Sequence, residues 1–489
     1  MDECVANETQ KQAGENEFRE GGESGADNVE VTLTANDTAN KRMKEMEVDR
    51  LSALPDCLLI HILSFLGLKK AAITSLLGKR WKLLWTELPT LEFSLWEDWE
   101  SRDKITQARR EFVARVHKTL ATRRGKCLEK LDVQFRYNKC FASDVDSWLG
   151  AALKLKVKHV SLALMFSKQS YPLHEMIYTY SSLTSLSLLG CIFEPERAIK
   201  WPSLTSLDIS DVYLPQLVVD NILSGCPVLK SLYLSECWGF TCFEIHSQNL
   251  GELSVHESFN ESSDDDIFKI SAPHLKSLDM SFYPSDSNLK LSNISSLVSA
   301  SFSLIDDWNL GSQDVLSHIK DIFDSTQHVT ELELGCDIIK ALAAALLLGP
   351  WQLPKSMRRC LKINRFIHDE ENISAILGLL ESSPNLETLI IERYDPKEIA
   401  EENWVLPGRS DMGCDLLHLK TVKLYSMADP KLGGEPLLTL ARNLLKRAPA
   451  LEEMVIGVRV EDVSDFIKIG QTLLSYPRAS PNAVISFLS

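Results

Sequence analysis

The sequence predicts an α/β protein with a small N-terminal unit of three helices, a long solenoid of parallel strands, and a closing C-terminal module. Two observations lead to this architecture. The stretch at residues 50–94 contains more apolar residues than one helix contact requires, and a Leu-x-x-Leu-x-Leu pattern recurs from residue 128 onward. A short pattern that returns at regular intervals is typical of a solenoid, in which each repeat packs only against its neighbours.

Residues 1–49 are polar and contain 13 acidic and five basic residues, so they carry half of the net charge of -16. Such a segment has too few large apolar side chains to offset the conformational entropy lost on ordering. We therefore expect residues 1–49 to form a disordered acidic tail.

Residues 50–94 begin with a helix start at Leu54-Pro55-Asp56, where proline at the first helical position sacrifices no hydrogen bond. The apolar residues that follow fan over roughly 220° of the helix, wider than the ~100° stripe of one core contact. Further helices are predicted near Lys69–Leu76 and Lys79–Thr86. The pattern alone leaves two interpretations open: a surface for a partner helix, or a helical unit packed on its own chain.

This stretch resembles a plant F-box. The family pattern is matched by the residues 54–56, 58, 59, 62–66, 74, 75, 77, 79–81, 84, 85, 89 and 93, and the sequence departs from it at Gly67, Leu68 and Gly78. The resemblance implies docking on a Skp-type adaptor. Some of the residues expected at the adaptor face must instead form the core of the F-box, and the candidates are Leu54, Pro55, Leu58, Ile62, Leu63, Leu77 and Trp81.

Residues 95–127 are predicted to form a linker with a capping helix. Ile105, Phe112, Val116 and Leu120 recur at helical spacing, with arginines on the opposite face. These arginines lack the interleaved aromatic residues of a nucleic-acid surface.

Residues 128–395 contain the repeats, with central spacings of 21, 25, 21, 25 and 22 residues from Leu183 to Leu297. These spacings fall in the leucine-rich-repeat range, and each copy should contribute one strand to a parallel sheet. Spacings near 32 farther along the chain predict longer and more helical connections, and a blurred copy lies near Leu361 and Ile363.

Two features inside the repeats support this prediction. Cys191 and Cys237 follow a repeat leucine by three residues, a position where a small polar group can satisfy backbone donors in the turn. Repeated Ser/Ala/Cys-Pro-x-Leu sequences predict turns that lead into strands, because proline stops the preceding element. Outward residues between the repeat leucines are the candidates for target binding, namely Asp208, Tyr233, His256, Asp279 and Tyr425.

Residues 396–489 resemble the FBD module of plant F-box/leucine-rich-repeat proteins. The resemblance rests on Trp404, Pro407, Cys414, and the segments 416–422, 441–445, 448–454 and 476–481. Apart from that resemblance, the same stretch predicts two more repeat-like strands and an amphipathic helix at Leu437–Leu445, which would cover the end of the sheet.

The composition and the motifs argue against several classes of function. The net charge of -16 argues against a nucleic-acid partner. The eleven cysteines contain no Cys-x-x-Cys pair, and no apolar run approaches the ~20 residues of a membrane helix, so we expect an intracellular protein of the nucleus or cytoplasm. No catalytic motif, metal-ligand spacing or phosphate loop is present, so we expect no enzyme activity, no metal and no cofactor.

The resemblance to F-box proteins implies the substrate-recognition subunit of an SCF-type ubiquitin ligase. The F-box would bind the Skp-type adaptor, and through it cullin and RING subunits, while the repeats would bind an unknown target protein. Two alternatives stay open: an adaptor-bound scaffold or sequestering protein without a role in ubiquitin transfer, and a small-molecule co-receptor.

Overall fold

The computed structural model describes residue 51 and the ranges 53–96, 102–165, 170–257, 267–283, 288–305, 313–348, 351–364, 370–392, 412–428, 434–459 and 463–488. The chain divides into two compact units, Met1–Leu59 and Ile60–Ser489. The predicted tail at residues 1–49 lies outside the described residues, as do Trp404 and Pro407.

The short helices near the N-terminus are α2 (Asp56–Ser64), α3 (Gly67–Ile73), and the 3-10 turns η1 (Thr74–Leu76) and η2 (Leu84–Glu87). The first two predicted helices are confirmed. The predicted third helix at Lys79–Thr86 is wrong, because this segment forms turns that lead into η2. The backbone hydrogen bonds of this segment span three residues: the Thr86 amide donates to the Leu83 carbonyl at 3.0 Å, and the Leu88 amide donates to the Trp85 carbonyl at 3.4 Å. Bonds of this span form a 3-10 turn, whereas an α-helix requires bonds that span four residues.

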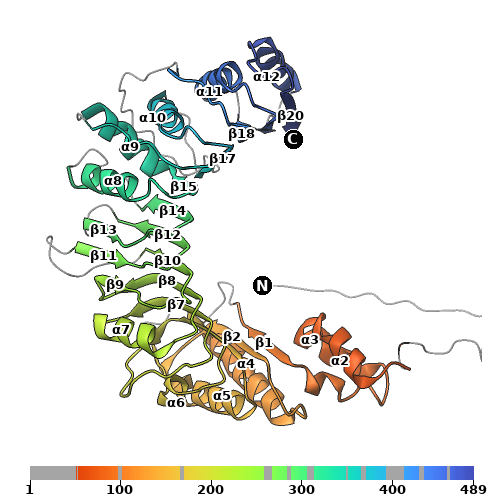
Figure 1. The fold of residues 1–489 in the computed structure, drawn as a ribbon. Coiled ribbons are helices and arrows are strands. Elements are labelled where there is room, and N and C mark those ends of the chain that lie inside the picture. The colour runs from red at the N-terminus through yellow and green to blue at the C-terminus, as the bar shows by residue number, and fades with distance from the viewer. Residues whose placement is uncertain are drawn as a thin grey trace, which may run out of the picture. The chain divides into compact units, whose positions relative to one another are not determined.

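Fifteen strands of the described chain form one parallel sheet whose order follows the sequence (Figure 1). The predicted parallel solenoid is therefore confirmed, and the blurred repeat is strand β16. The strands are β1 (Thr90–Ser94), β2 (Lys130–Arg136), β3 (His159–Met165), β5 (Ser185–Leu189), β7 (Ser206–Tyr213), β8 (Ser231–Trp238), β10 (Glu252–His256), β12 (Ser277–Phe282), β14 (Ser299–Leu304), β15 (Glu331–Gly335), β16 (Cys360–Asn364), β17 (Thr388–Glu392), β18 (Thr421–Ala428), β19 (Glu453–Arg459) and β20 (Val484–Leu488).

The connections between these strands carry helices, a short 3-10 turn and two small sheets. The helical segments are α4 (Arg102–Thr122), η3 (Lys139–Phe141), α5 (Ala142–Lys154), α6 (Glu175–Tyr178), α7 (Gln216–Gly225), α8 (Gln313–Ser325), α9 (Cys336–Leu348), α10 (Glu370–Glu381), α11 (Gly434–Arg447) and α12 (Val463–Ser475). The small sheets pair β4 (Tyr171–Pro172) with β6 (Cys191–Ile192), and β11 (Ile267–Ser271) with both β9 (Cys242–Glu244) and β13 (Asn288–Ser292).

The kind of connection changes along the sheet, and the longer repeats that follow β14 contain helices. The three connections between β8 and β14 contain the short strands β9, β11 and β13, whereas those from β14 to β17 contain α8, α9 and α10. A helix rises only about 1.5 Å per residue and a strand about 3.3 Å, so a helical connection needs more residues to cover the same distance. The predicted longer, helical connections in the later repeats are confirmed.

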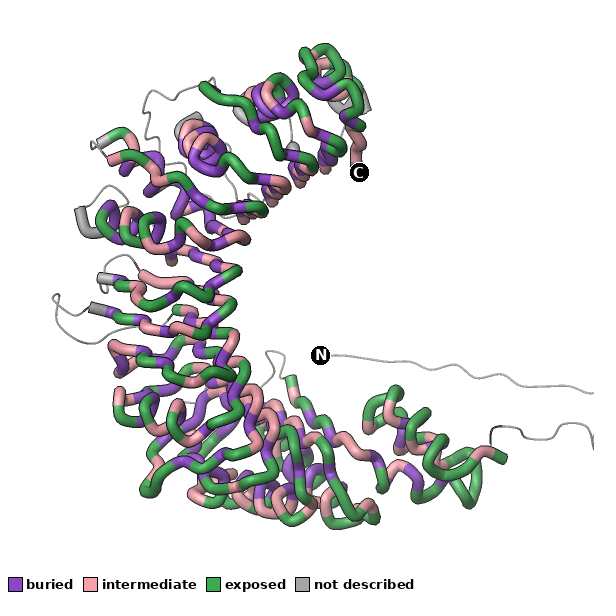
Figure 2. The backbone as a smooth tube through the Cα atoms, viewed as in Figure 1, coloured by how far each residue is buried: buried purple, intermediate pink, exposed green. Residues whose placement is uncertain are grey.

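The repeat leucines build the core. Leu207 aligns with Leu186 on β5 and with Leu232 on β8, and each of these side chains is at most 2% exposed. The same register joins Leu253 to Leu278, and one buried cluster runs from Leu91 to Ala483. Figure 2 shows buried and more exposed residues alternating along the strands. The residues between the leucines therefore form the outer face of the sheet.

The proline-containing turns behave as the sequence predicts. The Leu229 amide donates to the Cys226 carbonyl at 3.2 Å, and the Leu386 amide donates to the Ser383 carbonyl at 3.1 Å. Proline occupies the second position of each of these turns, where its fixed φ is favourable. The turns place the next repeat leucine at the entry to its strand.

The C-terminal segment contains the two predicted repeat-like strands, β18 and β19, and α11 covers the predicted amphipathic helix. It also contains α12 and the final strand β20, which pairs with β19. The end of the sheet is thus one strand farther along the chain than the repeat pattern indicates.

Candidate protein-interaction surfaces

Large apolar side chains are unusually exposed in α2, α3 and η1 and the residues that join them. The exposed fraction is 75% for Phe65, 84% for Leu76 and 67% for Leu77. Leu58, Ile62, Leu66 and Ile73 are also exposed. We call these seven residues the exposed apolar set. Leaving so many large side chains in water is unfavourable for an isolated chain and is typical of a protein-interaction surface.

The residues expected at an adaptor face fall into three classes of exposure. Pro55, Leu58, Ile62 and Leu77 are exposed, and Leu54 is half-buried. Leu63 and Trp81 are only 1% and 5% exposed, so they are part of the core. Sequence reasoning did not single out Phe65, Ile73 or Leu76, because an apolar pattern does not tell which face of a short helix is covered.

The junction between α2 and α3 depends on glycine. Gly67 has a φ of +69°, and a Cβ added there would have no heavy atom within 4 Å. Proline, which the F-box pattern has at this junction, is fixed near a φ of about −65° and cannot adopt this conformation. The departure from the family pattern at residue 67 therefore has a structural consequence, a left-handed turn between the two helices.

A second surface lies on the outer face of the sheet, where serine dominates the central repeats. β14 presents Ser299, Ser301 and Ser303, and similar serines occupy β5, β7, β8 and β12. Short serine side chains leave the larger residues between them accessible. Four of the five candidate target-binding residues lie here, on the adjacent strands β7, β8, β10 and β12.

These four residues are linked by close contacts. Asp208 is opposite Tyr233 in the register of β7 and β8, and the rings of Tyr233 and His256 lie 5.3 Å apart. His256 Nε2 lies 3.4 Å from Asp279 Oδ2, and His256 Nδ1 lies 3.1 Å from Ser281 Oγ. The structure therefore brings Asp208, Tyr233, His256 and Asp279 together.

Tyr425 does not join this cluster. It lies on β18, where it is opposite Glu392 of β17. Four strands, β14 to β17, separate β18 from β12 in the sheet order. Outward position in a strand is a signal that all five residues share, and it does not indicate which of them are neighbours.

The two carboxylates have opposite pKa shifts. Burial raises the pKa of Asp208, and the hydrogen bonds from Ser187 and Ser210 only partly oppose this. Burial also acts to raise the pKa of Asp279, but hydrogen bonds from His256 and Ser301 and the charge of His256 outweigh it, so that pKa is lowered. The folded protein therefore disfavours the ionised form of Asp208, whereas it stabilises the ionised form of Asp279.

The sequence pattern does not indicate three further acidic residues, which lie near the carboxyl ends of β7, β8 and β10. Asp211, Glu236 and Glu257 have φ values of 54°, 51° and 48° and are exposed. Ser210, Ser235 and His256 are aligned across the strands, so the residues that follow them occupy equivalent positions. Left-handed backbone is most often signalled by glycine, asparagine or aspartate, and the glutamates at residues 236 and 257 give no such signal.

The predicted structural cysteines are buried, and burial raises the pKa of Cys191 and Cys237 to about 12. The expectation that they satisfy backbone donors is not met. Cys237 Sγ instead lies 3.4 Å from the Ile209 carbonyl and 3.3 Å from the Ser235 carbonyl. A neutral thiol carries one weak S–H donor, so it pairs with carbonyl oxygens.

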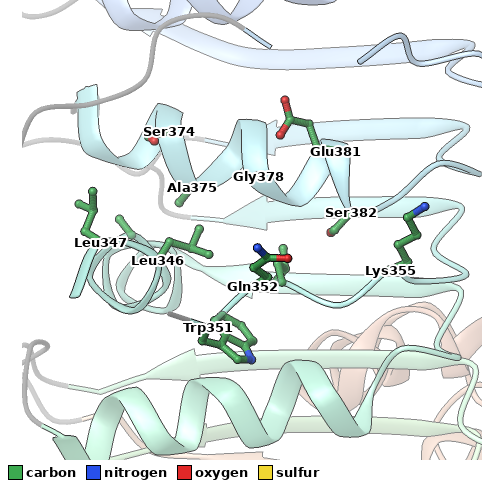
Figure 3. A pocket seen from close by; sticks show the side chains of 12 residues that line it. Leu346, Leu347, Trp351, Gln352, Lys355, Ser374, Ala375, Gly378, Glu381 and Ser382 are labelled. Carbon is green, nitrogen blue, oxygen red and sulfur yellow. The ribbon is translucent and has the colours of Figure 1, made fainter. Parts of the chain in front are cut away.

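Two cavities lie among the connections. One of about 610 Å³ lies between α9 and α10 and is lined by Leu346, Trp351, Lys355 and Gly378 (Figure 3). The other, of about 820 Å³, is lined by residues of α7 and the segment 242–249. Neither is lined by any of the five candidate target-binding residues.

No group of three His, Cys, Asp or Glu residues in the described part of the chain could hold a metal ion. Among the helices that the structure describes, none combines the length and apolar character required to cross a bilayer.

Comparisons with known proteins relate this chain to leucine-rich-repeat and F-box proteins. The family model of the leucine-rich-repeat domain of At1g61320/AtMIF1 matches residues 119–470. The chain is similar to three proteins of Arabidopsis thaliana. It is 31% identical to F-box/LRR-repeat protein At3g26922 over 52% of this chain and 81% of that protein. It is 25% identical to FBD-associated F-box protein At5g22730 over 88% of this chain and 92% of that protein.

The third relative is the putative F-box/LRR-repeat protein At5g54820, which is 31% identical over 45% of this chain. The match spans about half of that relative, 49% of its length.

Proposed function

The chain belongs to the F-box/leucine-rich-repeat protein family, and from this premise we propose that it is the substrate-recognition subunit of an SCF-type ubiquitin ligase. In this proposal the exposed apolar set and Pro55 bind a Skp-type adaptor, which joins the chain to cullin and RING subunits. The outer face of the central repeats binds the target protein. The chain itself contributes no catalytic group.

The exposed apolar set is the observation that carries the proposal. Fully burying one large apolar side chain contributes roughly 1.5 to 3 kcal/mol, so covering several of them would support a stable complex. The structure separates these residues from Leu63 and Trp81, which are buried already. A partner surface rich in apolar side chains would complete the packing that this segment lacks.

In this proposal the chain promotes ubiquitin transfer by bringing the target close to the enzyme that carries ubiquitin. Binding a target on the same particle as the ubiquitin-charged enzyme raises the effective concentration of the target's lysines near the reactive thioester. Bond formation is then performed by other subunits.

Adaptor docking can be tested with matched serine variants. Leu76→Ser and Leu77→Ser, made together in the full chain, should reduce co-purification of a recombinant Skp-type adaptor at least tenfold. The control is Leu347→Ser on α9, the same kind of substitution at a single side chain that is 44% exposed and lies outside the exposed apolar set. Undiminished adaptor binding by the double variant, with the control also binding, would contradict the proposal.

Target binding at Asp208, Tyr233, His256 and Asp279 is the second part of the proposal. It is supported by their mutual contacts and by the exposure of Tyr233, whose exposed fraction is 38%. Tyr is a favoured anchor in protein interfaces. Tyr425, four intervening strands away, would contact a different part of a long target. An adaptor-bound chain that captured a target without shortening its half-life would instead be the scaffold or sequestering protein.

A further inference from the structure

The six central strands of the sheet, β5, β7, β8, β10, β12 and β14, contain no lysine or arginine. Their outer face and carboxyl ends carry acidic side chains among the serines. We call this region the central anionic surface, and its acidic members are Asp208, Asp211, Glu236, Glu257 and Asp279. It is bounded at the amino ends of the strands by Lys230 and Lys276, which flank Glu252.

Three of these carboxylates are stacked on neighbouring repeats. Asp211, Glu236 and Glu257 occupy equivalent positions, and neighbouring strands lie about 4.8 Å apart. Gly190, with a φ of +71°, holds the corresponding position after β5. Glycine would adopt this left-handed backbone most easily, so the conformation does not explain the glutamates at residues 236 and 257. Like charges at this spacing repel one another.

Within the described ranges, the carboxylates of this stack have no basic partner. No lysine or arginine lies within ion-pair distance of Asp211, Glu236 or Glu257 among the residues that the structure describes. Some acidic residues elsewhere on the sheet do have a basic partner. Lys362 Nζ on β16 lies 3.5 Å from Glu333 and 3.7 Å from Glu392. Unlike Glu333 and Glu392, the three stacked carboxylates carry negative charge that no lysine or arginine among the described residues offsets.

Aromatic rings accompany the carboxylates. Tyr233 lies beside His256, and at the carboxyl ends of β7 and β8 the rings of Tyr213 and Trp238 are 6.2 Å apart. Tyr213 is 50% exposed and packs against Gly239, where a Cβ would overlap its ring. Tyrosine and tryptophan faces attract arginine and lysine side chains, and carboxylates hydrogen-bond to them.

We propose that the central anionic surface binds a segment of the target protein rich in arginine and lysine. The proposal rests on the assigned role of the sheet in target binding, but not on adaptor docking. Basic side chains would neutralise the stacked carboxylates and lie against Tyr233 and Tyr213. Serines between them would leave room for extended backbone.

A peptide-binding measurement tests this proposal. The probe is a fluorescein-labelled decapeptide of alternating arginine and serine, with alternating glutamate and serine as the control peptide. Fluorescence anisotropy with the full chain should detect the basic peptide at about 50 mM salt, weaker binding at about 200 mM, and no binding of the acidic peptide.

Two double variants with the same change in net charge locate the site. Glu236→Gln with Glu257→Gln should weaken peptide binding about tenfold. Glu333→Gln with Glu392→Gln, which removes carboxylates already paired with Lys362, should change it less than about twofold. Thermal unfolding of both variants checks that the fold is retained, and replacing Tyr233 by alanine gives an independent measure of the same surface.

Several results would overturn the proposal. Absence of basic-peptide binding would do so, as would equal binding of the acidic peptide. Equal affinities for the wild type and the Glu236/Glu257 variant would place the peptide elsewhere, for example on acidic residues 1–49. Adaptor co-purification from the same preparations should be unchanged in both variants, so a failure here is distinguishable from a failure of the proposed adaptor docking.

Discussion

His256 and Asp279 join two adjacent strands of the sheet through an imidazole–carboxylate contact, with Nε2 3.4 Å from Oδ2. β10 contributes the histidine, β12 contributes the aspartate, and Ser301 on β14 hydrogen-bonds to the same carboxylate. Three consecutive repeats are therefore connected on the outer face as well as through their leucines. This polar connection holds the proposed target-binding residues in place.

The first prediction concerns Asp279→Asn. The folded-state pKa of Asp279 is below its ordinary value of 3.8, because hydrogen bonds from His256 and Ser301 outweigh the effect of burial. Ionised Asp279 therefore contributes stability above about pH 4, and this contribution is lost as the pH falls through the folded-state pKa. The variant should melt roughly 1 °C lower at pH 7. Below about pH 4 the difference from the wild type should shrink. Thermal unfolding followed by circular dichroism checks this, and an unchanged difference across the acid range would contradict it.

Asp208→Asn should have the opposite effect. Burial raises the folded-state pKa of Asp208, so the ionised carboxylate destabilises the folded state at neutral pH. Replacing it by asparagine should raise the melting temperature by roughly 1 °C at pH 7. The gain should disappear as the pH falls and the wild-type carboxyl becomes protonated. The same variant should weaken basic-peptide binding. A lower melting temperature at pH 7 would contradict this interpretation of Asp208.

Arg358 provides a third prediction, about stability alone. Its side chain is fully buried, and its three guanidinium nitrogens have no hydrogen-bond partner in the part of the chain that the structure describes. The guanidinium carbon lies 5.2 Å from the centre of the Phe323 ring, and burial lowers the pKa of Arg358 to about 10. A buried charge without an ion-pair partner is strongly unfavourable. Arg358→Met keeps much of the side-chain volume and should stabilise the fold by about 1 to 3 kcal/mol.

The neighbouring arginine is the matched control for this experiment. The Arg359 side chain is 69% exposed and lies 3.7 Å from Glu387. Arg359→Met should change the free energy of unfolding by less than about 0.5 kcal/mol, because exposed ion pairs contribute little. Chemical denaturation of both variants makes the comparison. A destabilised Arg358→Met would show that the guanidinium has a partner in solution.

Some parts of the fold follow from the sequence pattern and others do not. Periodic leucines predict the strands well, because each one must be buried: Leu232 and Leu253 lie where the repeat places them. Strand β1 was not predicted as part of the sheet, although Phe93 was recognised as an F-box residue. Phe93 fits the F-box pattern and also lies in a strand of the sheet. Only the pairing of β1 with β2 shows where the F-box segment leads into the solenoid.

The interaction surfaces were less predictable, for two physical reasons. Exposure of Phe65 or Leu76 depends on what packs against short helices, and an apolar pattern does not record that. The stack of Asp211, Glu236 and Glu257 arises from strand register, which brings together residues 21 to 25 positions apart. Recognising it requires the alignment of each strand with its neighbour.

The last prediction concerns Gly67, whose left-handed φ of +69° sets the turn between α2 and α3. Because nothing lies within 4 Å of an added Cβ, substitutions there act through backbone conformation and not through a clash. Gly67→Asn should retain adaptor affinity, since asparagine tolerates this conformation. Gly67→Ala should lose about 1 kcal/mol of the free energy of adaptor binding. Gly67→Pro, which restores the residue typical of the F-box pattern, cannot adopt the turn and should weaken adaptor binding most. Affinities of the three variants for a Skp-type adaptor, measured by surface plasmon resonance, give the order. If the proline variant bound the adaptor as tightly as the wild type, the left-handed turn would not be needed in the complex.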